Sequence, residues 1–175
     1  MPALIDAFEA NARAAAATVV RMPGSPAVAL ALVLGAVRDS RAIVLDPGEF
    51  LSPEVTEALG YLPGLVRQPS DEALSTADVG ISSAFAGIAS TGSVCIAMGP
   101  PLAAAASLLV PLHIVLLYAD RIVERPRDLF NLTCLDGEGL RRNLVLITGP
   151  SATADMGPLV RGVHGPRRLQ IFLLE

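Results

Sequence analysis

The sequence predicts an α/β fold with a mainly parallel sheet that is covered by helices on both faces. Helix and strand signals alternate along the 175 residues, and the strongest strand signal, at 112–118, is a continuous apolar run. Strands that are buried on both faces carry such runs, whereas strands with one wet face alternate between polar and apolar residues. A chain of this length builds one core by default, so we expect a single domain over residues 1–175.

The first half of the chain alternates between helix and strand signals. Ser25 and Ser52 are suitable N-caps, and each is followed by a proline at the first helical position. The expected elements are, in order, a helix at 4–17, a strand at 18–20, a helix at 26–37, a strand at 42–45 and a helix at 53–59.

The second half opens with small residues, β-branched residues and glycines at 79–98, with bends near Gly87 and Gly92. This composition predicts a hairpin-like insertion. The elements expected after it are a helix at 102–109, a strand at 112–118, a helix from about 126, a strand at 143–148, a short helix that ends near 160 and a strand at 169–174.

Composition excludes several function classes. A net charge of −4 with 17% charged residues provides no basic surface for nucleic acid. All thirteen basic residues are arginine, which excludes a lysine Schiff base and a P-loop lysine. Cys95 and Cys134 lie on apolar stretches and are expected to be buried, reduced thiols. They form no metal or iron–sulfur framework, and no flavin or nicotinamide fingerprint is present, so no cofactor and no metal are expected.

The uncharged span 102–119 is long enough to cross a bilayer. Pro111 interrupts it, and a helix followed by a buried strand explains its texture better, so no membrane span is expected. The beginning of the sequence carries Asp6 and Glu9 and lacks the positive start and apolar core of a signal peptide. We therefore expect a cytoplasmic protein.

In open α/β sheets, ligands bind just beyond the carboxyl ends of strands. The first such candidate is a ligand-binding turn made of Ser90, Thr91, Gly92 and Ser93. Gly92 permits a tight turn, and the three hydroxyls could face a polar ligand. An ordinary serine-rich turn that bonds its own backbone is the alternative.

The second candidate lies between the predicted strand 143–148 and the predicted helix after it. Gly149, Ser151 and Thr153 would form an anion-binding concavity of hydroxyls and backbone N–H groups at a helix start. Asp155 could be a general base, a hydrogen-bond acceptor for a substrate hydroxyl, or an acid that complements the helix dipole.

The third candidate is the connection at 161–168, where Gly162 is expected to end the helix. His164 could bind an anion or transfer a proton, or could be a loop histidine bonded to backbone. We expect His164 and Gly165 to share one anion site with the 149–155 loop. His113, at the head of the buried strand, is expected to be a satisfied core histidine.

These segments together resemble the LUD domain of the lactate-utilisation protein C family (LutC/YkgG). The resemblance covers about the C-terminal hundred residues, while the preceding part matches in the order of its elements. The two most specific blocks are the last ones, and the full set is 79–81, 89–93, 111–114, 119–123, 149–155 and 162–166. Ser90 stands where the family usually has glutamate, and Ser93 replaces its usual threonine, so this loop lacks a carboxylate.

The resemblance implies a three-layer fold like that of the NagB/RpiA/CoA-transferase group, whose members handle sugar phosphates or CoA thioesters. It also implies a process, because family members are encoded with two iron–sulfur partner proteins and take part in oxidising L-lactate to pyruvate. The leading hypothesis is a non-redox subunit of that system that binds a small anionic ligand, a carboxylate or a phosphate. The alternatives are an enzyme that acts on a sugar phosphate or a CoA ester, and a degenerate structural or regulatory member.

Overall fold

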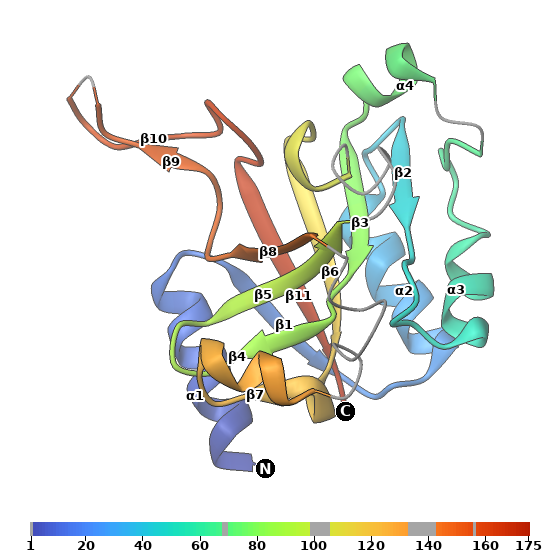
Figure 1. The fold of residues 1–175 in the computed structure, drawn as a ribbon. Helices are drawn as coiled ribbons and strands as arrows, with labels where there is room; N and C mark the ends of the chain where they lie inside the picture. The colour runs from blue at the N-terminus through green and yellow to red at the C-terminus, as the bar shows by residue number, and fades with distance from the viewer. Residues whose placement is uncertain (1, 68–69, 99–105, 133–142, 156) are drawn as a thin grey trace.

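The computed structural model describes residues 2–67, 70–98, 106–132, 143–155 and 157–175. Its centre is a five-stranded, fully parallel sheet (Figure 1). The strand order is β1 (Thr18–Met22), β11 (Arg168–Leu174), β6 (Leu112–Tyr118), β3 (Val79–Ser83) and β2 (Ile43–Asp46). The α/β class and the mainly parallel sheet are therefore confirmed.

Both faces of this sheet are buried. In β11, the successive residues Ile171 and Phe172 pack in two different hydrophobic clusters. Neighbouring residues of a strand point to opposite faces. Phe8 of α1 (Pro2–Ala14) belongs to the first cluster, whereas Val33 of α2 (Pro26–Val37) and Val55 of α3 (Pro53–Leu59) belong to the second. Helices thus cover both faces, as the continuous apolar runs predicted.

Local signals explain where the helices of the second face begin. Pro26 and Pro53 each occupy the first helical position, as predicted. The Ser52 hydroxyl accepts a hydrogen bond of 3.3 Å from the backbone N–H of Val55, whereas Ser25 makes no side-chain cap bond. A further helix, α4, spans Asp71–Ser75.

A second sheet covers part of the α1 face. Its order is β7 (Ile122–Val123), β4 (Ala86–Ile88), β5 (Ser93–Met98) and β8 (Asn143–Ile147). The β4–β5 pair is antiparallel and forms the expected hairpin. The predicted insertion began too early, because β3 is a strand of the central sheet. The predicted strand at 143–148 exists as β8, but it pairs antiparallel with β5 instead of joining the central sheet.

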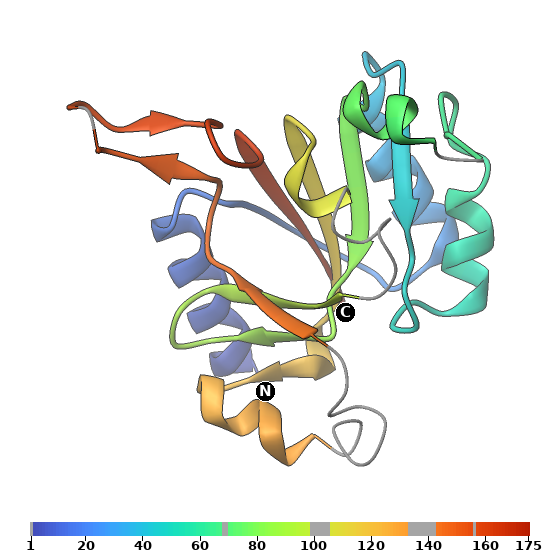
Figure 2. The same cartoon turned by 45° about the horizontal axis from the view of Figure 1, so that its top comes forward.

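The predicted helix between 151 and about 160 is wrong. This segment forms a two-stranded antiparallel arm, β9 (Ala152–Thr153) with β10 (Val160–Arg161), which projects from the body (Figures 1 and 2). Gly157 and Pro158 interrupt any helix. The N–H of Gly162 donates to the Ser151 carbonyl at 2.9 Å, so Gly162, at φ +82°, closes the arm and does not end a helix.

The remaining predicted elements have mixed outcomes. The helix expected from about 126 is a 3₁₀ helix, η2 (Pro126–Asn131), and a short one, η1 (Ala119–Arg121), follows β6. Residues 102–105 of the predicted helix at 102–109 lie outside the described residues, and residues 106–108 are helical. Within the described ranges, no helix is long and apolar enough to span a bilayer.

Candidate functional site

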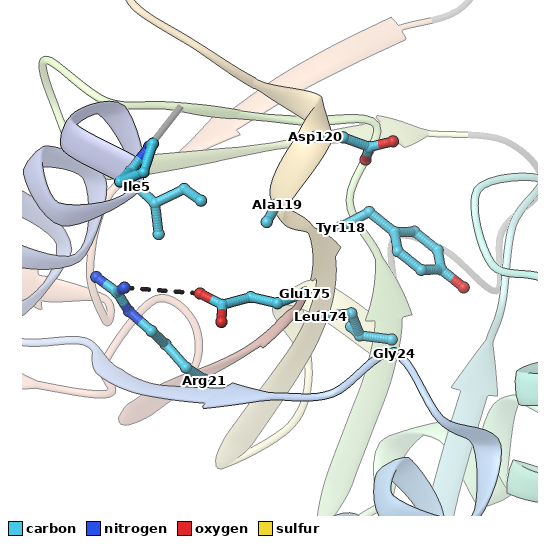
Figure 3. Close-up of a pocket in the computed structure, with 9 residues that line it drawn as sticks. Ile5, Arg21, Gly24, Tyr118, Ala119, Asp120, Leu174 and Glu175 are labelled. Atoms are coloured by element: carbon cyan, nitrogen blue, oxygen red, sulfur yellow. Dashed lines mark ion pairs between the residues drawn. The ribbon is translucent and has the colours of Figure 1, made fainter.

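A pocket of about 730 Å³ lies at the carboxyl edge of the central sheet (Figure 3). It is bounded where β1, β6 and β11 end, and α1 contributes Pro2 and Ile5. The other lining residues are Arg21, Gly24, Tyr118, Ala119, Asp120, Leu174 and Glu175. This is the edge at which parallel α/β sheets bind ligands.

Arg21 is the cation of this carboxyl-edge pocket. Its Nε donates to Glu9 at 2.7 Å, and its Nη2 donates to Asp6 at 2.5 Å. The hydrogen bond to Asp6 and then that to Glu9 raise the pKa of Arg21 above its ordinary value. Nη1 lies 3.6 Å from Glu175 Oε1, which is an ion pair beyond hydrogen-bond distance. Nη1 makes no hydrogen bond to any other described residue.

The backbone fixes Glu175 beside Arg21. The N–H of Glu175 donates to the Met22 carbonyl at 2.9 Å, and the N–H of Gly24 donates to the Glu175 carbonyl at 2.8 Å. These bonds continue the β1–β11 pairing past the end of β1. Figure 3 shows the two side chains facing each other, with Ile5 close by.

On the other side of the pocket, Tyr118 and Asp120 follow from the end of β6 (Figure 3). The Tyr118 hydroxyl accepts a hydrogen bond of 3.3 Å from the N–H of Ser52, so its ring is tied to the start of α3. Asp120 lies in η1. The pocket thus offers one guanidinium, two carboxylates and apolar walls from Ile5, Ala119 and Leu174.

The predicted turn Ser90–Thr91–Gly92–Ser93 joins β4 to β5, away from this pocket. Two of its hydroxyls bond to each other and one of them to a neighbour, with Ser93 Oγ 2.7 Å from both Thr91 Oγ1 and Thr148 Oγ1. Gly92 has φ +65°, and a Cβ there would lie 2.1 Å from the Ala12 nitrogen of α1. This geometry accounts for the turn through its own packing. A ligand-binding role for it stays a prediction.

The arm brings together three of the predicted site residues. Thr153, Asp155 and His164 line one pocket of about 360 Å³, together with Pro158, Val160 and Val163. The antiparallel pairing of the arm causes this proximity, whereas the sequence argument invoked a helix start that does not exist. The catalytic roles of Asp155 and His164 stay predictions.

The base of the arm holds the other predicted residues. Gly149, at φ +71°, packs against the residue that follows α1, because a Cβ there would lie 2.0 Å from the Ala15 carbonyl oxygen. Gly165 packs against Ser151, because a Cβ on the glycine would lie 3.2 Å from the serine Cβ. Pro150 lines a pocket with residues that begin β1, β6 and β11. The predicted loop therefore lies at the amino edge of the central sheet, because β8 runs in the second sheet.

A buried pair lies between β3 and β6. Ser82 Oγ is 2.7 Å from His113 Nε2, and both side chains are almost fully buried. Burial lowers the pKa of His113 to about 4, so the ring is neutral at physiological pH. Nδ1 has no hydrogen-bond partner among the described residues. His113 is thus the expected core histidine, although only one ring nitrogen is satisfied.

Sequence reasoning missed Arg21 and Glu175. Arg21 lies next to the carboxyl end of β1. The ends of strands were also the criterion that selected the three later loops as candidates. However, residues far apart in the sequence build this pocket, and only the β1–β11 pairing brings them together. Asp120 lay within the 119–123 block of the resemblance, but it was not singled out.

Comparison with known proteins gives consistent results. The family model of the LUD domain matches residues 5–174. An uncharacterised protein of Neisseria meningitidis is 34% identical over 104 residues, 59% of this chain and 45% of that protein. Lactate utilization protein C of Halalkalibacterium halodurans is 32% identical over 130 residues, 72% of this chain and 55% of that protein. The namesake from Exiguobacterium is 30% identical over 128 residues, 71% and 56% of the two chains.

This chain therefore spans about half the length of the curated relatives it matches. Among solved structures, a DUF162 family protein from Deinococcus radiodurans superimposes with a TM-score of 0.72 over 99% of this chain and 98% of that one, at 21% sequence identity. That similarity supports the fold.

Proposed function

This chain belongs to the LUD domain family, and from that membership we propose that it is a non-redox subunit of a cytoplasmic lactate-utilisation system. Two relatives that are at least 30% identical carry the name lactate utilization protein C. We further propose that the chain binds a small hydroxy acid of the size of lactate in the carboxyl-edge pocket.

The observation that carries this proposal is the placement of Arg21 beside Glu175 between apolar walls. Lactate combines a carboxylate, a hydroxyl donor and a methyl group. Arg21 Nη1 is held only by the 3.6 Å contact to Glu175, so a ligand carboxylate can accept from it. The Glu175 carboxylate would then accept the ligand hydroxyl, and Ile5 or Leu174 would contact the methyl group.

The local charge disfavours ligands that carry more than one negative charge. Asp6, Glu9 and Glu175 all contact Arg21, and Asp120 lines the same pocket. Carboxylates outnumber the guanidinium, so a doubly charged phosphate ester would be repelled more strongly than a monocarboxylate. This argues against a sugar phosphate or a CoA ester at this edge, and it predicts weak binding of lactate, with a Kd of about 1 mM.

Electron transfer would belong to partner subunits. This chain has two cysteines, whereas biological iron–sulfur clusters are usually held by four ligands. Cys95 is fully buried, and burial raises the pKa of its thiol to about 11. Such a thiol is a poor metal ligand. We propose that iron–sulfur partner proteins accept the electrons while this subunit holds the ligand.

Calorimetric titration with L-lactate tests the proposed site. Arg21→Gln should weaken binding about tenfold or more, because the ligand loses a charge-assisted hydrogen bond. Arg38→Gln is the control, since it removes the same charge from a side chain that is 80% exposed and pairs only weakly, at 3.7 Å, with Asp39. Lactate binding that is equal in the two variants would reject the Arg21 site.

Comparing lactate with pyruvate tests the role of Glu175. Pyruvate has no hydroxyl to donate, so Glu175→Gln should weaken lactate binding more than pyruvate binding. An equal effect on both ligands would show that Glu175 acts only through the charge of Arg21. His164→Ala and Asp155→Asn test the pocket on the β9–β10 arm as the second candidate site. That pocket is favoured only if these variants lose lactate binding and Arg21→Gln keeps it.

A further inference from the structure

A third pocket, of about 160 Å³, lies at the amino edge of the central sheet, opposite the carboxyl-edge pocket. We propose that it binds a phosphate group. Three of the described residues that line it are arginines, and the other described lining residues are uncharged. The polar and loop residues that matter are Thr18, Pro150, Arg161, Arg167, Arg168 and Gln170.

Backbone contacts hold these arginines in place. The N–H groups of Arg167 and Arg168 both donate to the Pro111 carbonyl, at 3.0 and 3.1 Å. Arg161 lies on β10, and the residue after it, Gly162, packs so closely that a Cβ there would lie 2.9 Å from the Arg167 Cβ. Three arginines on anchored segments thus line one pocket, although β10 and the start of β11 are separate in the sequence.

The described residues leave the charge of this site uncompensated. Within the described part of the chain, no carboxylate lies within ion-pair distance of these three arginines, whereas Arg13, Arg21, Arg38, Arg125 and Arg127 all have one. Among the described residues that line the pocket, none is acidic. Arginines that line one pocket without acidic partners favour an anion with more than one charge, and their planar guanidinium groups match phosphate oxygens.

The size of the pocket limits the ligand. At about 160 Å³, it is smaller than the roughly 300 Å³ at which pockets for drug-sized ligands begin. It can hold a phosphate group but not a whole nucleotide. Thr18 and Gln170, which are register partners in the β1–β11 pair, also line the pocket and are neutral polar residues. The ligand is therefore free phosphate or the phosphate end of a larger molecule.

The test is a titration with inorganic phosphate at constant ionic strength, followed by calorimetry and thermal unfolding. The variant replaces Arg161, Arg167 and Arg168 by glutamine. The charge-matched control replaces Arg38, Arg125 and Arg127, which are 80%, 55% and 75% exposed. We expect saturable binding by the parent and the control, and a loss of about a hundredfold or more in the variant, because several charge-assisted hydrogen bonds disappear.

Glycerol phosphate serves as the second arm of the experiment. Equal affinity for both anions would identify a site for a free phosphate group, and tighter binding of the ester would identify a phosphorylated ligand. The proposal is overturned if the parent shows no saturable phosphate binding up to about 20 mM, or if the charge-matched control loses as much as the variant. Lactate binding should be unchanged by the variant, so this result is independent of the proposed function.

Discussion

The buried histidine His113 should make the stability of the fold depend on pH in a way that can be measured. Its folded pKa is lowered to about 4 by burial, from an ordinary value of 6.5. Between these values the unfolded chain takes up a proton that the folded chain refuses. The contribution to stability is therefore fully present above pH 6.5, and it is lost as the pH falls towards 4.

The full difference between the two pKa values corresponds to about 3 kcal/mol, at about 1.36 kcal/mol per pKa unit. Between pH 7 and pH 5, the loss of unfolding free energy from this residue is about 2 kcal/mol. His113→Gln should remove that loss, because glutamine stays neutral and can still bond Ser82. His164 is the matched control, since it is exposed and is the only other histidine.

The assay is urea unfolding at pH 7 and pH 5, followed by circular dichroism, with residues 1–175 predicted to unfold as one domain. Carboxylates that titrate in this range contribute equally to the parent and to both variants. The parent and His164→Gln should lose about 2 kcal/mol more than His113→Gln does. An unchanged pH dependence in His113→Gln, or a flattened one in His164→Gln, would refute the assignment.

Two further predictions concern packing and thiol chemistry. Gly92→Ala should destabilise the fold by about 2 kcal/mol or more, because φ is +65° and a Cβ would meet the Ala12 backbone at 2.1 Å. Gly35→Ala, in a helix with open space around it, should instead stabilise the fold by up to about 1 kcal/mol. Thermal unfolding of the two variants is the measurement, and equal shifts in Tm would contradict the prediction. Burial raises the pKa of the Cys95 thiol to about 11, so in a Cys134→Ser background Cys95 should resist a thiol reagent at pH 8 until urea unfolds the chain. Rapid labelling of the folded chain would contradict its burial.

Continuous apolar runs made the central sheet predictable. The run at 112–118 could only be covered on both faces, and β6 lies in the middle of the sheet. Ser52 and Pro53 likewise marked the start of α3, because the cap and the first helical position follow local rules.

Pairing between distant strands was not predictable from such signals. The run at 143–147 resembles a buried parallel strand, yet Leu146 is 46% exposed because β8 lies at the edge of the second sheet. Ser151 begins a segment with a plausible helix start, but its carbonyl accepts from Gly162 across the arm. These two differences moved the expected anion loop from the carboxyl edge to the amino edge of the sheet.

The candidate site depended on tertiary structure even more. Arg21 and Glu175 meet only because β1 and β11 are neighbours in the sheet. The expectation of an anion-binding chain still has a physical basis in this fold, since unpaired arginines gather at the amino edge. Neither position follows from local patterns around a single residue.

A crystal structure of the chain soaked with L-lactate would test the proposed function most directly. We predict lactate in the carboxyl-edge pocket, with its carboxylate on Arg21 Nη1 and its hydroxyl donating to Glu175. Lactate bound instead between Asp155 and His164 in the arm, or an empty carboxyl-edge pocket at a lactate concentration of about ten times the Kd measured in solution, would contradict the proposal.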